Sequence, residues 1–104
     1  MIKMNYRVEF HPKAAKEFLK LDGRVKKLVA RQIAKLEKKP AIGQLLGNKQ
    51  GLDLTSCRKL YVDNKRVRIV YEVIDQQVVV FIFAIGNRDE MKVYKDASKR
   101  KNTS

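Results

Sequence analysis

The chain has 104 residues and a formal net charge of +13, from 24 lysines and arginines against 11 aspartates and glutamates. We therefore expect a single domain over 1–104, with one modest core and an ordered part from about residue 4 to 98. The single cysteine, Cys57, excludes an intramolecular disulfide, and no apolar run reaches the length of a transmembrane helix.

The positive charge favours an anionic partner. Nucleic acid is the first candidate, with anionic membrane surfaces and acidic proteins as the alternatives. The N-terminus lacks the apolar stretch of a signal peptide, so we expect a cytoplasmic protein. No cluster of Cys and His has the spacing of a metal site, and we expect neither metal nor cofactor.

The N-terminal part of the chain predicts a strand followed by a helical hairpin. Residues 5–10 alternate polar and apolar, as in a strand. A helix begins at His11-Pro12, because proline is tolerated at a first helical position, and Asp22-Gly23 ends it. A second amphipathic helix is predicted from about 24 to 38, and the short turn between the two helices makes them antiparallel.

The middle of the chain predicts a loop and three strands. Residues 40–56 are low in apolar residues and predict a loop that leucines attach to the core, namely Leu45, Leu46, Leu52 and Leu54. Strands are predicted at about 57–63, 66–74 and 77–85. The connections between them are tight turns, which make the three strands an antiparallel meander.

The C-terminal part predicts one helix, from about 89 to 100, with Asp89 as its N-cap and a frayed end from Lys99. Together these elements predict an α+β fold. A twisted antiparallel sheet packs against an N-terminal strand and an α-helical hairpin, and a short C-terminal helix follows.

Strand alternation sorts side chains into two faces. The face toward the helical hairpin is predicted to hold apolar residues, namely Leu60, Val62, Val67, Ile69, Tyr71, Val73, Val79, Phe81, Phe83 and Ile85. The open face is predicted to hold Lys59, Tyr61 and Arg68 together. On the third strand this face is apolar, with Val78, Val80 and Ile82, so the C-terminal helix, a partner or both must cover it.

Cations beside a tyrosine suit proton chemistry on RNA. Cleavage of RNA needs a base for the 2′-hydroxyl, an acid for the leaving 5′-oxygen and cations for the charge that develops on phosphorus. Lys59, Arg68 and Arg88 could surround a phosphate, and cations close to Tyr94 would lower the pKa of its phenol and make it a base. The one histidine, His11, sits at a strand-to-helix junction and is interpreted as a cap or surface residue.

The chain resembles the RelE/ParE superfamily of bacterial toxins, in particular its RelE branch. The resemblance covers about residues 5–100 and rests on VEFHPKAAKEFLKL and on RIVYEV, VVVFIFAIGNR and the final VY. It implies a RelE-like fold and a ribosome-dependent endoribonuclease, which cuts messenger RNA in the decoding site without metal. The implied partners are the 70S ribosome, its mRNA and a cognate antitoxin with an acidic or amphipathic segment. The toxin itself would be monomeric and form a hetero-oligomer with that antitoxin.

Carried over onto this sequence, the resemblance implies four catalytic residues. Lys59 and Arg68 would bind the scissile phosphate, Arg88 would be the acid or stabilise charge, and Tyr94 would be the general base or stack on the substrate. The family's second strand lysine is replaced here by Tyr61. Lys65 or Arg66 could supply the missing cation, or Tyr61 could stack on a base. The RNA-binding candidates are Tyr61, Lys65, Arg66, Lys92 and Lys95.

Two other functions remain open from the sequence. One is a ParE-like inhibitor of DNA gyrase that acts through protein contacts, and the other is a plain RNA-binding module. The fold does not separate them from the nuclease. The joint presence of Lys59, Arg68, Arg88 and Tyr94 favours the nuclease.

Overall fold

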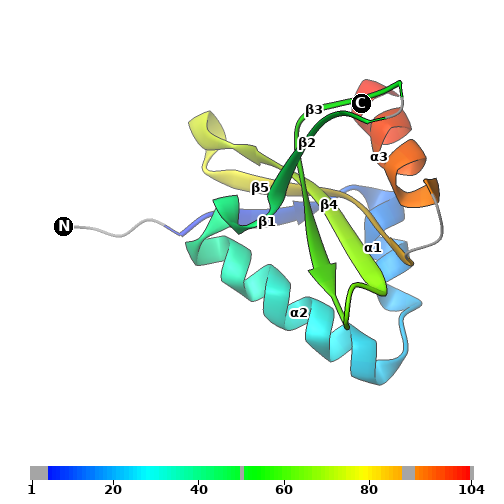
Figure 1. The fold of residues 1–104 in the computed structure, drawn as a ribbon. Helices are drawn as coiled ribbons and strands as arrows, with labels where there is room; N and C mark the ends of the chain where they lie inside the picture. Colours follow the sequence, from blue (N-terminus) through cyan, green and yellow to red (C-terminus); the bar gives the residue numbers. More distant parts are fainter. Residues whose placement is uncertain (1–4, 50, 88–90, 104) are drawn as a thin grey trace.

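The computed structural model describes residues 5–49, 51–87 and 91–103 and shows the α+β fold (Figure 1). Its strands are β1 (Arg7–Phe10), β2 (Gln44–Lys49), β3 (Leu52–Val62), β4 (Val67–Ile74) and β5 (Val79–Asn87). Its α-helices are α1 (Pro12–Leu19), α2 (Gly23–Lys38) and α3 (Lys92–Thr103), with 3₁₀ turns at Pro40–Ile42 and Asp75–Gln77. Within the described ranges, no helix is both long and apolar enough to cross a membrane.

The sheet has the order β1-β5-β4-β3-β2 and lies between two helical layers. The α1–α2 hairpin covers one face, and α3 covers part of the other (Figure 1). The predicted antiparallel pairing holds for β3, β4 and β5, and β2, which was not predicted, pairs antiparallel with β3. The N-terminal strand joins the same sheet at its edge, where β1 runs parallel to β5.

Side-chain caps begin both helices of the hairpin, close to the predicted positions. The Nδ1 of His11 accepts a hydrogen bond from the Lys13 amide at 3.1 Å, which confirms His11 as a cap. The Oδ1 of Asp22 accepts one from the Val25 amide at 3.0 Å. These caps satisfy amide groups that have no partner within their own helix.

The predicted loop over 40–56 is wrong, because most of this segment forms β2 and the first part of β3. The sequence of this β2–β3 segment does not predict strands, because it is polar and interrupted by glycine. Gly47 and Gly51 adopt left-handed φ values of 67° and 81°, and the register shifts between Leu45 and Gly47. Leu54 is fully buried as expected, whereas Leu45 stays 60% exposed.

The faces of β4 agree with the alternation, but those of β5 do not. Cross-strand partners run from Arg68–Gly86 to Val70–Ala84 and then step to Tyr71–Ile82, which leaves Phe83 as an extra residue on β5. Such a bulge exchanges the two faces of a strand beyond it.

The bulge therefore overturns the predicted faces of β5 at Phe81 and Phe83, whereas Ile85 faces the hairpin as predicted. Val80 and Ile82 are fully buried against the hairpin, while Phe81 and Phe83 pack on the side of α3. Val80 and Ile82 were expected on the open face of the sheet, where the C-terminal helix or a partner would cover them. That expectation is wrong for the same reason. Both faces of β5 are covered within the chain itself.

Helix α3 extends to Thr103, beyond the predicted end at residue 100 and through the segment where we expected fraying. Arg100 is only 9% exposed and donates to both carboxylate oxygens of Glu17 at 2.8 and 2.9 Å. It also donates to the Phe83 carbonyl at 2.9 Å. These bonds attach the last turns of α3 to α1 and β5. The predicted cap, Asp89, lies outside the described residues.

Candidate active site

Tyr61 lies at the centre of a cluster of cations on the open face of the sheet. It pairs with Arg68 across β3 and β4, as the alternation predicted. Lys59 Nζ donates a hydrogen bond to the Tyr61 hydroxyl at 2.9 Å. The guanidinium carbon of Arg68 lies 5.3 Å from the centroid of the Tyr61 ring, and Lys65 Nζ lies 5.6 Å from it. Both are within the range of cation–π attraction.

Arg68 also contacts a tyrosine of α3, so this helix contributes to the site together with β3 and β4. Its guanidinium carbon lies 5.1 Å from the centroid of the Tyr94 ring. The Nε of Arg68 is buried, and no hydrogen-bond acceptor for it lies within residues 5–49, 51–87 and 91–103. We call Lys59, Tyr61, Lys65, Arg68 and Tyr94 the tyrosine–cation cluster. Its cations and donors suit a phosphate group.

Tyr94 is fully buried, and this burial determines the direction of its pKa shift. Burial raises the pKa of Tyr94 and is the largest influence. The charges of Arg68 and Lys59 lower that pKa, and the interaction with the neighbouring Tyr61 phenol raises it again. The net shift of the pKa is upward. The cations thus act in the expected direction, but the expected net lowering of the pKa of Tyr94 is wrong, because desolvation outweighs them.

A glycine lets α3 approach closely enough to place Tyr94 on Arg68. Gly86 is the cross-strand partner of Arg68 on β5. A Cβ built at Gly86 would lie 3.4 Å from both Cβ and Cγ2 of Val93, at the limit of ordinary van der Waals contact, so a side chain larger than a methyl group would push α3 away.

Arg100 is a positioning residue that sequence reasoning missed. Its ion pair with Glu17 holds the helix that carries Tyr94. A signal was present in the sequence, since Arg100 continues the buried stripe of Val93 and Ala97 at helical spacing. An arginine on an apolar stripe indicates a buried partner.

The other predicted RNA-binding residues lie in different surroundings. Arg66 is exposed and lines a pocket that includes Asp63 and Arg24, near the turn between α1 and α2. Lys92 is exposed and paired with Asp96 at 3.0 Å. Lys95 is exposed on α3. Of the predicted phosphate ligands, Arg88 lies outside the described residues.

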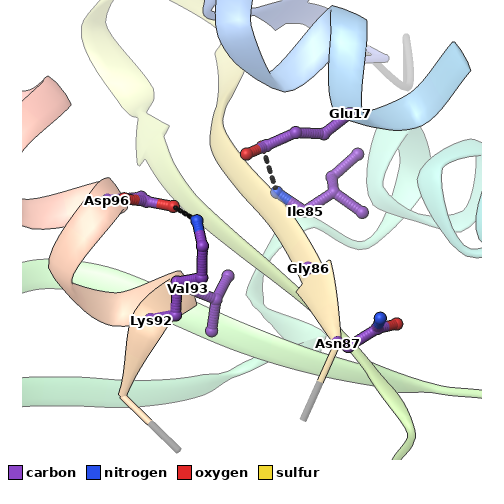
Figure 2. Close-up of a pocket in the computed structure, with 7 residues that line it drawn as sticks. All are labelled: Glu17, Ile85, Gly86, Asn87, Lys92, Val93 and Asp96. Carbon is purple, nitrogen blue, oxygen red and sulfur yellow. Dashed lines mark hydrogen bonds and ion pairs between the residues drawn. The ribbon is translucent and has the colours of Figure 1, made fainter. Parts of the chain in front are cut away.

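A separate pocket of about 300 Å³ lies between the end of β5 and the start of α3 (Figure 2). Its lining includes the carboxylates of Glu17 and Asp96, together with Lys92. Glu17 accepts a hydrogen bond from the Ile85 amide at 3.0 Å, as drawn in Figure 2. The two carboxylates make this pocket a poor site for phosphate, and none of its lining residues belongs to the tyrosine–cation cluster. In the described part of the chain, no three potential metal ligands gather.

Comparison with known proteins identifies the family. Residues 8–91 match the family model of the ParE toxin of the type II toxin-antitoxin system parDE. The chain belongs to the RelE/ParE toxin superfamily. Within it, the chain is RelE-like, because it is 32% identical over 99 residues to the mRNA interferase toxin RelE of Escherichia coli K12. That alignment covers 93% of this chain and 98% of the relative.

Solved structures of RelE agree with this placement. A mutant of the E. coli toxin RelE in the free state superposes with a TM-score of 0.77 at 31% identity, covering 93% of this chain and 98% of that one. A RelE mutant in complex with an antitoxin RelBc peptide gives 0.68 at 30% identity, covering 90% and 95%. The predicted resemblance and the RelE-like fold are confirmed.

Proposed function

We propose that this RelE-like toxin inhibits translation as an endoribonuclease that cleaves mRNA in the decoding site of the ribosome. The observation that carries the proposal is the tyrosine–cation cluster, where Lys59 and Arg68 flank a phenol on an open sheet face. Phosphate binding and proton transfer need this combination, and a toxin acting by protein contacts alone does not. The similarity to a protein named mRNA interferase toxin RelE supports the same activity.

The proposed reaction is attack by the 2′-hydroxyl on the adjacent phosphorus without a metal ion. Lys59 and Arg68 bind the scissile phosphate and stabilise the charge that develops in the transition state. Arg88 adds positive charge or acts as the acid, and Tyr94 accepts the 2′-hydroxyl proton or orients the nucleotide. The raised pKa of the buried Tyr94 means that its phenol must become exposed to substrate before it can act as a base. Tyr61, Lys65, Arg66, Lys92 and Lys95 contribute RNA contacts.

Partners follow from the charge and from the relatives. A toxin of net charge +13 suits an acidic or amphipathic antitoxin segment, and a solved RelE structure contains an antitoxin RelBc peptide. We propose a cytoplasmic toxin that is monomeric when free, forms a hetero-oligomer with its antitoxin, and binds the 70S ribosome and mRNA.

A second candidate function is the poisoning of DNA gyrase. The observation in its favour is the family model, which is described as a ParE toxin. The tyrosine–cation cluster and the sequence identity with RelE favour the nuclease.

Mapping of new mRNA 5′ ends after induction in a bacterial host separates the two functions. We expect cuts within translated messages that keep the phase of the reading frame. A DNA-damage response without such cuts would instead support gyrase as the target. Arg68→Ala is the matched variant, and it should abolish the cuts while the protein still folds.

A further inference from the structure

We propose that Tyr61 is the general acid of this toxin and donates its phenolic proton to the leaving 5′-oxygen of the cleaved RNA. This inference rests on the proposed ribonuclease function and adds a catalytic residue to it. From the sequence alone, Tyr61 is predicted only as an RNA-binding residue that stacks on a base.

The contacts of Tyr61 favour loss of a proton from its hydroxyl. Lys59 Nζ is the donor in the 2.9 Å bond, so the phenolic oxygen of Tyr61 is an acceptor there. Arg68 and Lys65 lie at 5.3 and 5.6 Å from the ring centroid. Three positive charges therefore surround the negative charge that would remain on the phenolate.

The chemistry of the leaving group requires such an acid. When the 2′-oxygen forms its bond to phosphorus, the bond from phosphorus to the 5′-oxygen breaks and its electron pair stays on that oxygen. The Tyr61 proton neutralises this alkoxide and gives a 5′-hydroxyl, while the other fragment ends in a 2′,3′-cyclic phosphate. The base of the reaction takes the 2′-hydroxyl proton, and exchange with water then restores both groups.

The position of Tyr61 distinguishes it from the other tyrosine of the cluster. Tyr61 is partly exposed on the open face of the sheet, whereas Tyr94 on α3 is fully buried. A phenol at neutral pH carries its proton and is ready to act as an acid without prior ionisation. Within residues 5–49, 51–87 and 91–103, the groups with a contact to Tyr61 given above are Lys59 on β3, Lys65 in the turn between β3 and β4, Arg68 on β4 and Tyr94 on α3. These four are cations or a phenol, and a cation favours loss of the proton.

The test compares two leaving groups in single-turnover cleavage on programmed ribosomes. One mRNA is unmodified, and the other carries sulfur in place of the bridging 5′-oxygen at the cleaved bond, because a thiolate leaves without protonation. Tyr61→Phe should cleave the unmodified mRNA about 10²–10⁴-fold more slowly than the wild type. On the sulfur substrate, the variant and the wild type should have nearly equal rates. Tyr6→Phe, a tyrosine bonded to Asp75 at 2.6 Å and outside the cluster, is the matched control and should cleave both at the wild-type rate.

The outcomes separate this inference from the proposed function. If the wild type does not cut unmodified mRNA, the ribonuclease itself is wrong. If the wild type cuts and Tyr61→Phe is equally impaired on both substrates, or on neither, Tyr61 is not the acid and the ribonuclease stands. Should Tyr61→Phe fail to fold, incorporation of 3-fluorotyrosine at position 61 replaces it, since fluorine makes a phenol more acidic at nearly constant size. The alkaline decline in rate should then move to lower pH, and an unchanged profile would overturn the proposal.

Discussion

Tyr71 holds the connection between α2 and β2 through its hydroxyl group. The hydroxyl donates to the Pro40 carbonyl and accepts from the Gly43 amide, each at 2.8 Å. Both Tyr71 and Gly43 are buried. A Cβ built at Gly43 would lie 2.8 Å from the Lys59 carbonyl oxygen, so only glycine fits beside the strand that carries Lys59.

Tyr71→Phe should lower the free energy of unfolding by about 1–3 kcal/mol, because the buried amide of Gly43 loses its acceptor. Urea denaturation of both proteins measures the difference. The control is Tyr6→Phe, which removes a hydroxyl bonded to the exposed Asp75 and should change stability far less. Equal losses in the two variants would contradict the role assigned to the Tyr71 hydroxyl.

His11 should make the toxin less stable as the pH falls below about 6.5. Burial and the charges of Arg100 and Lys13 lower the pKa of His11 from its ordinary value of 6.5, although Glu17 opposes them. The unfolded chain then binds the proton at a higher pH than the folded chain, so stability is complete above 6.5 and falls as the pH drops from there. Protonation of Nδ1 also removes the acceptor for the Lys13 amide.

Thermal unfolding between pH 5 and pH 7.5 measures this effect of His11. His11→Asn keeps a side chain that can cap a helix but has no titrating group in that range. Its melting temperature should therefore depend less on pH than that of the wild type. Identical pH dependence in the two proteins would exclude His11 as the cause.

At the scale of single residues, contacts within the sheet could be predicted from the sequence, but burial under a neighbouring element could not. The meeting of Lys59, Tyr61 and Arg68 followed from alternation along two neighbouring strands. The burial of Tyr94 did not, because it depends on how closely α3 packs over Gly86, which no local pattern encodes. The direction of its pKa shift depends on that burial, so it was predicted with the wrong sign.

At the scale of elements, the ion pair of Arg100 with Glu17 should determine whether α3 keeps Tyr94 in the cluster. Arg100→Met should lower the free energy of unfolding by about 1–3 kcal/mol, because it deletes charge-assisted hydrogen bonds to Glu17 and Phe83. The cleavage rate should fall as well, since Tyr94 then loses its fixed position on Arg68.

Two measurements separate positioning of α3 from a general loss of stability. Arg100→Lys restores one charge and should recover part of the cleavage rate. Arg24→Met removes the ion pair between the first turn of α2 and Asp63, with atoms 3.0 Å apart. It should leave the rate unchanged. If Arg100→Met at a temperature where it is fully folded cleaves like the wild type, the ion pair does not position Tyr94.

The elements themselves were predictable where their pattern was strong. Both helices of the hairpin and the central strand β4 carry clear apolar periodicity and lie near their predicted bounds. For β3 only the end was predicted closely, because the strand begins at Leu52 and not at about residue 57. The β2 strand was missed because Gly47 and its polar neighbours give no alternation. The faces of β5 were exchanged because its residues are apolar on both sides, so the sequence contains no mark of the extra residue at Phe83.

For the whole molecule, binding to ribosomes should depend steeply on salt. The net charge of +13 is carried by one compact fold, and each phosphate that a cation neutralises releases counterions. A plot of log affinity against log salt should therefore have a large negative slope. Lys59→Ala should make that slope shallower by about one unit of charge, whereas a flat slope for the wild type would mean that the cations do not form the contact surface.

Because of the extra residue at Phe83, the packing of β5 depends more on the number of residues in the strand than on which aliphatic residues it contains. The strand presents Val80 and Ile82 to one layer and Phe83 and Ala84 to the other, and the count of residues between them determines this division. Exchange of one aliphatic residue for another along β5 is a small perturbation. Deletion of a single residue there would turn small aliphatic side chains toward the layer that packs phenylalanine. It would also turn phenylalanine toward the layer that packs aliphatic residues. Among homologous toxins, insertions and deletions in this strand should therefore occur in compensating pairs or not at all.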